Sequence, residues 1–342
     1  NLLNFNTQDN LASGGDRCGA PVDQTFGQAR PSTTLDPSIL SGWGARPYDW
    51  QFGLSVQQEV VPRVSVEVGY YRRWWPIFGA NDVTDNILTG ASDYTSFNVT
   101  APSDPRLPNG GGYSVNNIYN ITPVGAAKGT QNVQTAANDF GDFTRYWDGF
   151  DITAQARLRN GLTLQGGTST GRLVQDSCEP REAVPEGIAT GANATLANPW
   201  CRQVEPMLTT VKGLASYVIP KVDVQVAGTF SSRPGVSLTA NVVYTSAQVS
   251  GSLGRPLTGV PNVTVNVVEP NTVFGDRIDQ LDLRIGKILR FGRTRTNLNL
   301  DIVNALNSND NLAYSPTFGA TWPAPTSVIT ARLFRLSAQF DF

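Results

Sequence analysis

The chain has 342 residues, which is enough for one large all-β domain or two ordinary domains. Its formal net charge is −2 and it has no basic tail or run, so we expect no binding to nucleic acid. The sequence contains no histidine, which excludes imidazole as a general base, a metal ligand or a pH-sensitive group.

The composition favours strands and loops over helices. The chain has 33 glycines, 22 prolines and many aromatic residues, whereas good helix formers are sparse. No stretch approaches the ~18 consecutive apolar residues of a membrane helix. A transmembrane barrel remains compatible with this composition, because its apolar residues are spread over every second position. The chain starts at Asn1 without an initiator methionine or a signal peptide, so we expect it to be processed or a piece of something larger.

Residues 1–47 alternate poorly and are rich in Asn, Gly, Ser and Pro, so we interpret them as a long surface loop or N-terminal extension. Strict alternation begins after residue 48, and we assign residues 48–342 to a β-barrel region. Its first hairpin has strands at 50–60 and 64–70, joined by a tight turn near 61–63.

A long loop near residues 76–142 follows this hairpin. Short β-like pieces at Tyr94–Val99 and Tyr113–Thr122 indicate strands that extend beyond a membrane. Four aromatic residues before the loop fit either an aromatic girdle at a membrane interface or an ordinary protein core, and the sequence leaves both open: Tyr70, Tyr71, Trp74 and Trp75.

Three more hairpins follow the same scheme of a tight turn at one end and a long loop at the other. Asn160-Gly161 is the strongest turn signal among them. Within the third long loop, Val236–Val249 and Val263–Val268 are predicted to pair with each other. The tight turns lie near 159–161, 219–221 and 291–293, and the long loops near 175–205, 233–276 and 304–325.

The last seventeen residues, from Thr326, are predicted to form one continuous strand. One parity is apolar and gives four candidate membrane-facing residues: Phe334, Leu336, Phe340 and Phe342. Charged residues of the opposite parity, here and in earlier strands, are candidates for lining a lumen. These are Asp151, Asp282, Arg284, Asp301, Arg335 and Asp341. They would either solvate the lumen and pair with one another, or contact a plug or a passing solute.

The predicted architecture is an all-β, antiparallel transmembrane-type β-barrel, or an open portion of one. Short turns on one side and long loops on the other are typical of bacterial outer-membrane barrels. The prediction has nine strands, whereas closed single-chain barrels of bacteria have an even number. An open sheet leaves two unpaired edges that lipid does not tolerate. We therefore expect the C-terminal part of a bigger barrel, or a chain that completes its sheet with a neighbour.

Cys178 and Cys201 bracket a polar segment, which predicts a disulfide in an oxidising compartment. The alternative is that all three cysteines are unpaired. Cys18 has no obvious partner in the sequence.

Four segments resemble the C-terminal barrel of TonB-dependent receptor-like outer-membrane proteins. The resemblance is strongest to the Oar-like group, which has an N-terminal carboxypeptidase-regulatory-like domain. It implies a barrel of about 22 strands with an N-terminal plug in the lumen. This chain lacks the plug, the earlier strands and the TonB box that energises transport. The four segments are Gln57–Tyr70, Asn160–Gly171, Gly286–Gly292 and Gln339–Phe342.

The sequence has no clear motif for phosphate binding or calcium binding. The glycine-rich positions do not lie between a strand and a helix, and the acidic turn at 307–311 lacks the spacing of a twelve-residue calcium loop. We therefore expect no catalytic residue, no metal, no cofactor and no enzymatic activity.

The leading hypothesis is an outer-membrane barrel protein that passes or binds a ligand at the bacterial cell surface. Its expected partners are outer-membrane lipid, the missing strands and plug of the same or another chain, and further copies through open strand edges. The alternative is a structural subunit of an extracellular surface polymer built by strand addition. A soluble β-sandwich or adhesin domain is a third hypothesis. The sequence does not identify a ligand.

Overall fold

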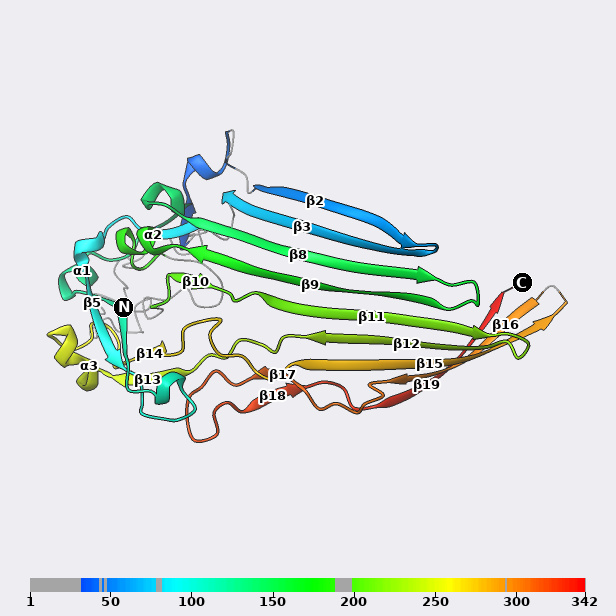
Figure 1. The fold of residues 1–342 in the computed structure, drawn as a ribbon. Helices are drawn as coiled ribbons and strands as arrows, with labels where there is room; N and C mark the ends of the chain where they lie inside the picture. Colours follow the sequence, from blue (N-terminus) through cyan, green and yellow to red (C-terminus); the bar gives the residue numbers. More distant parts are fainter. Residues whose placement is uncertain are drawn as a thin grey trace, which may run out of the picture.

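A single antiparallel sheet organises the computed structural model, which describes residues 32–42, 45, 48–77, 82–187, 199–292 and 294–341. Nine strands follow one another in the sheet in chain order, and the short β10 (Arg202–Val204) pairs with β9 as a tenth strand. We call the nine strands the main sheet (Figure 1). They are β2 (Tyr48–Val61), β3 (Val64–Ile77), β8 (Thr144–Arg157), β9 (Thr163–Asp176), β11 (Leu208–Ile219), β12 (Val224–Arg233), β15 (Ile278–Phe291), β16 (Thr294–Val303) and β19 (Leu333–Asp341).

The main sheet confirms the predicted all-β antiparallel fold. Its nine strands correspond to the nine predicted from alternation. The sheet is open in the described residues, because β2 and β19 form its two edges and do not pair with each other.

Very short turns join the strands at one end of the main sheet, on the right in Figure 1. Several turn residues have the left-handed backbone conformation that reverses a chain tightly. Arg63 has φ 71° between β2 and β3, Gly161 has φ 87° between β8 and β9, and Lys221 has φ 72° between β11 and β12. Gly292, with φ 60°, follows β15. These turns keep consecutive strands adjacent and antiparallel.

Four long connections gather at the opposite end of the main sheet (Figure 1). We call their described residues, together with residues 32–42, the cap. The cap contains β1 (Thr33–Leu35), β4 (Asp82–Asn86), β5 (Tyr94–Thr100), β6 (Ser114–Ile121), α1 (Pro123–Ala127), β7 (Asn132–Ala136), α2 (Cys178–Ala183), β10, β13 (Asn241–Thr245), α3 (Ser246–Leu253), β14 (Asn262–Asn266), β17 (Asn311–Tyr314) and β18 (Pro325–Val328). Its 3-10 helices are Pro37–Ile39, Ala91–Asp93, Pro108–Gly110 and Ala137–Phe140. No helix among the described residues is both long and apolar enough to span a membrane.

The cap strands other than β10 pair among themselves. β13 pairs with β14, as the sequence predicted for the two valine-rich runs. The two pieces predicted in the first long loop are strands, β5 and β6, which pair with each other and do not continue the main sheet. β1 lies parallel to β7, which gives part of the predicted surface loop at residues 1–47 a place in the cap. Cys18 and most of the rest of that loop lie outside the described residues.

A hydrophobic core holds the long connections together. Val265, Val267 and Val268 from the third connection are fully buried against Val115 and Ile118 from the first. Because each fully buried aliphatic side chain stabilises by about 1.5–3 kcal/mol, such a core gives the cap its own stability. The fourth connection adds Trp322, which is buried in the same cluster and whose indole N–H donates to the carbonyl of Thr239 at 2.8 Å.

The second connection is closed by a disulfide, and a buried arginine fixes it to the first connection. Cys178 and Cys201 are joined, which confirms the predicted bond. Arg181 follows in α2, stacks over the ring of Tyr119 at 5.3 Å and donates to the carbonyl of Asn117 at 3.1 Å. Burial lowers the pKa of Arg181 to about 10. These contacts tie α2 to β6, an element of the first connection.

The continuous terminal strand predicted from Thr326 is wrong, because the chain divides there into β18 and β19. Asn304 explains the break. Its side-chain amide donates to the carbonyls of Ser308 at 2.8 Å and Thr330 at 2.9 Å, and its side-chain oxygen accepts from the amide of Ser308 at 2.9 Å. Its backbone has φ 50°, a conformation that asparagine tolerates well. The segment between β18 and β19 therefore bonds to this loop and not to a neighbouring strand.

We expect Asn304→Ala to destabilise the protein by about 2–4 kcal/mol, because a buried side chain loses three hydrogen bonds and alanine disfavours a positive φ. Urea unfolding followed by tryptophan fluorescence measures this change. Asn307→Ala is the control, because Asn307 also has a positive φ, 53°, but is exposed and its side chain accepts a single bond from the amide of Arg332. Equal stability of both variants would contradict the role given to Asn304.

Candidate functional site

Strand register gives the main sheet two chemically different faces. Directly paired residues place their side chains on the same face. One row of such pairs runs from Thr153 through Gly167, Lys212 and Ser231 to Gln280. We call the face that carries this row the polar face, and the opposite one the apolar face.

All six candidate lumen-lining residues lie on the polar face by this register. Asp151 is paired with Ser169, and Asp282 with Thr229. Arg284, Asp301 and Arg335 are paired in one row across β15, β16 and β19. Asp341 is paired with Arg295 and accepts a hydrogen bond from Gln339 at 2.9 Å.

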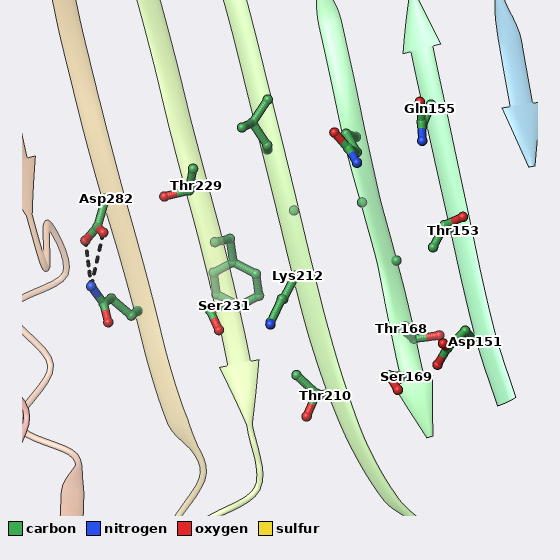
Figure 2. A pocket seen from close by; sticks show the side chains of 17 residues that line it. Asp151, Thr153, Gln155, Thr168, Ser169, Thr210, Lys212, Thr229, Ser231 and Asp282 are labelled. Atoms are coloured by element: carbon green, nitrogen blue, oxygen red, sulfur yellow. Dashed lines mark hydrogen bonds between the residues drawn. The ribbon is translucent and has the colours of Figure 1, made fainter. Parts of the chain in front are cut away.

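The middle of the polar face has a hollow of about 790 Å³. Figure 2 shows Lys212 on the central strand, with Asp151 and Asp282 on the outer strands of the group. Hydroxyl and carboxamide groups fill the space between these charges. They belong to Thr153, Gln155, Gln165, Ser169, Thr210, Thr229, Ser231 and Gln280.

The charges in the hollow differ in how they are held. Asp282 accepts from Gln280 at 3.0 and 3.1 Å and from the backbone amide of Asn304 at 2.8 Å (Figure 2 shows the bonds from Gln280). Asp151 has a buried oxygen, Oδ1, without a hydrogen-bond partner among the described residues. Lys212 is exposed. The hollow thus offers an ammonium donor at its centre and a carboxylate acceptor at the β8 side, with neutral hydrogen-bonding groups between them.

Glycine makes room for the hollow. At Gly167, an added Cβ would lie 2.4 Å from the carbonyl oxygen of Ile152. Since contacts below 3 Å do not occur for a real Cβ, the backbone of β8 would have to move to accept any side chain there. By contrast, a Cβ added at Gly213, on the neighbouring strand, would have no atom within 4 Å.

Three of the candidate residues form an ion cluster. Both arginines, Arg284 and Arg335, bind the carboxylate of Asp301, which is only 5% exposed. The Arg335 guanidinium donates to Oδ2 at 2.9 and 3.0 Å. Because the three residues come from β15, β16 and β19, the cluster holds the last three strands in register.

The apolar face is uncovered by any described element. Phe334, Leu336 and Phe340 of β19 lie on it and are 64%, 82% and 58% exposed. Phe342, the fourth predicted membrane-facing residue, lies outside the described residues. The same face continues through exposed side chains of the other strands: Phe52, Leu54, Val56, Val68, Phe150, Ile152, Val226, Ile285 and Leu298.

The four aromatic residues before the first long loop divide between the two faces. Tyr70 and Trp74 are paired with Phe150 and Tyr146 on the apolar face, near the cap. Tyr71 and Trp75 point the other way, so a girdle position is open only to Tyr70 and Trp74. The ring of Tyr71 would lie 2.7 Å from a Cβ added at Gly69, which shows that it covers this glycine. Trp75 lies between the guanidinium groups of Arg73 and Arg145, at 4.8 and 5.2 Å.

The polar face can bind solutes through hydrogen bonds and charge. Within the described residues, no group of three His, Cys, Asp or Glu side chains is placed to hold a metal ion. Lys212 was missed in the sequence because alternation is weak in β11, where Gly213 and Ala215 occupy apolar positions and Leu214 a polar one. The signal that could have placed Lys212 is its pairing with Gly167, which in turn is paired with Thr153 on the regularly alternating β8.

Comparisons with known proteins yield a distant likeness to a solved structure. No family model matches this chain, and no curated protein matches it in sequence. Among solved structures, the chain is similar to the outer membrane transporter YddB from Escherichia coli, with a TM-score of 0.45 and 13% sequence identity. The match covers 85% of this chain and 32% of the YddB chain. The family resemblance seen in the sequence therefore stays a prediction.

We expect Gly167→Ala to destabilise the protein by about 1–3 kcal/mol, because its Cβ collides with the β8 backbone. Gly213→Ala is the matched control, and it should change stability by less than about 1 kcal/mol because its Cβ meets open space. Urea unfolding of both variants tests the close packing beneath the hollow. Equal effects of the two substitutions would contradict it.

Proposed function

We propose that this chain forms part of the wall of a bacterial outer-membrane β-barrel, with the apolar face towards lipid and the polar face towards a lumen. The observation that carries the proposal is the uncovered apolar face, which runs from β2 to β19. Monomeric soluble proteins rarely expose apolar patches beyond a few hundred Å². Lipid is the solvent that makes such a face favourable.

The size of the apolar face supports this proposal. On β15, the side chains of the apolar face run from Leu281 to Leu289 and are interrupted by one charge, Lys287. These nine residues rise roughly 26 Å along the strand at about 3.3 Å per residue. A strand tilted by about 40° then crosses roughly 20 Å, close to the apolar band of about 25 Å in outer-membrane barrels. The short turns and long connections also lie at opposite ends, as in those barrels.

The edges of the main sheet support a larger barrel. Neighbouring strands are antiparallel, so β2 and β19, the first and last of nine, run in the same direction. Direct pairing of these edges would be parallel, whereas outer-membrane barrels are antiparallel throughout. Closure then needs an odd number of further strands, from residues outside the described part or from another chain.

The finer proposal is a TonB-dependent receptor-like protein that binds or passes a polar solute along the polar face. The hollow around Lys212 supports this, because its exposed ammonium and neutral hydrogen-bonding groups suit a polar ligand better than an apolar one. A plug and lipid are the partners that this proposal requires. We propose no enzymatic activity and no cofactor.

A second candidate function is a subunit of an extracellular surface polymer built by strand addition. The free edges of β2 and β19 favour it, since each presents unpaired backbone groups to a partner. Their common direction disfavours a simple chain of like-oriented copies, because every junction would be parallel. Filaments that form without detergent would support this candidate.

Charge placed on the apolar face should prevent membrane folding. We expect Leu54→Arg, near the middle of β2, to reduce the free energy of folding into vesicles by about 2–4 kcal/mol. Ser55→Arg is the matched control, because the adjacent side chain lies on the polar face and should change this free energy little. Urea titration in lipid vesicles measures both variants.

Two results would contradict the proposed function. One is equal folding of the two variants in vesicles. The other is a wild-type protein that stays monodisperse in buffer without detergent, because an exposed face of this size requires an apolar solvent or a covering partner.

A further inference from the structure

A row of charged side chains crosses the apolar face at its cap-side end. Arg72 of β3 is paired with Asp148 of β8, which is paired with Arg172 of β9. The row next to it towards the cap contains Trp74 and Tyr146, and the row on the other side contains Tyr70 and Phe150. The charges therefore lie within a band of aromatic residues at the cap-side end of the apolar face.

This row has a surplus positive charge, and the surplus belongs to Arg72. Asp148 is buried and pairs with Arg172 at 3.3 Å. Arg72 is exposed and has no ion-pair partner among the described residues. Its guanidinium stacks over the ring of Tyr146 at 4.7 Å instead.

Stacking on Tyr146 leaves the in-plane N–H groups of the Arg72 guanidinium available to bind a ligand. A guanidinium that rests its flat face on an aromatic ring keeps its in-plane N–H donors free for a bidentate acceptor. Phosphate is the acceptor that fits this fork, and charge assistance strengthens both bonds. A hollow of about 680 Å³ adjoins the arginine, lined by Phe52, Trp74, Phe143 and Tyr146 among others.

We propose that Arg72 binds the phosphate of an anionic lipid in the leaflet next to the cap, with the acyl chains lying on the apolar face below it. This inference rests on the proposed function, since it needs the apolar face in a bilayer. Aromatic side chains at membrane interfaces lie at the level of lipid headgroups, which places Arg72 at phosphate depth. Long connections face the outside in such barrels, so the lipid belongs to the outer leaflet.

The test uses the full chain in nanodiscs and measures retention of phosphatidic acid against phosphatidylcholine by native mass spectrometry. The choline ammonium balances its own phosphate, whereas phosphatidic acid presents an exposed phosphomonoester. Arg72→Gln should weaken retention of phosphatidic acid about tenfold, and Arg72→Lys about threefold because lysine keeps the charge but loses the fork. Arg73→Gln is the matched control, since Arg73 is the next residue on the same strand and points to the polar face, where it pairs with Asp49 at 2.8 Å.

Each outcome decides the inference. A selective loss in the Arg72 variants supports it, and equal effects of Arg72→Gln and Arg73→Gln overturn it. Displacement of the lipid by inorganic phosphate at equal concentration also overturns it, because the site would then be one for a free anion. A wild-type chain that enters nanodiscs without preference for phosphatidic acid refutes the inference alone. A chain that enters them neither by itself nor together with the strands that close its sheet refutes the proposed function, and the inference with it.

Discussion

The two faces of the main sheet depend on keeping a two-residue alternation in step across nine strands. A slip of one residue in any pair would move the charges of one strand to the apolar face and its apolar side chains to the polar face. Specific contacts prevent such a slip where alternation alone is weakest. Asp301 binds arginines from the strands on both sides of it, and the positive-φ turn residues Arg63, Gly161 and Lys221 fix the starting pairs of three hairpins.

The cap and the main sheet place their apolar side chains in opposite ways. The cap collects valines, aromatics and leucines from connections far apart in the sequence and buries them in its interior. The main sheet turns its apolar residues outwards and leaves them uncovered. A chain that buries one set and exposes the other is adapted to water at one end and to an apolar solvent along the sheet. The same division places Arg72, Trp74 and Tyr146 at the boundary between the two media.

Alternation predicted most of the main sheet, because polar and apolar residues alternate over most of strands such as β2, β12 and β15. It failed where long-range bonds decide the conformation. The hydrogen bond from Asn304 to the carbonyl of Thr330 breaks the terminal strand, although the sequence there reads as continuous. The cap core was not predictable, since it depends on contacts such as the 2.8 Å bond from Tyr113 to the carbonyl of Val267, 154 residues away. In the hollow, alternation in the sequence predicted the positions of Asp151 and Asp282 on the polar face. The position of Lys212 could be assigned only from the pairing of β11 with β9.

The central claim is that the two faces of the main sheet meet different solvents. The most direct measurement places a spin label at successive positions of β19, from Phe334 to Gln339, in protein reconstituted into vesicles with Cys18 replaced by serine. Accessibility to lipid-soluble oxygen and to a water-soluble nickel complex is then compared at each position. We predict a period of two, with oxygen favoured at Phe334, Leu336 and Ala338, and the nickel complex favoured at Arg335, Ser337 and Gln339. Equal access of the nickel complex to both sets would contradict a membrane-facing sheet.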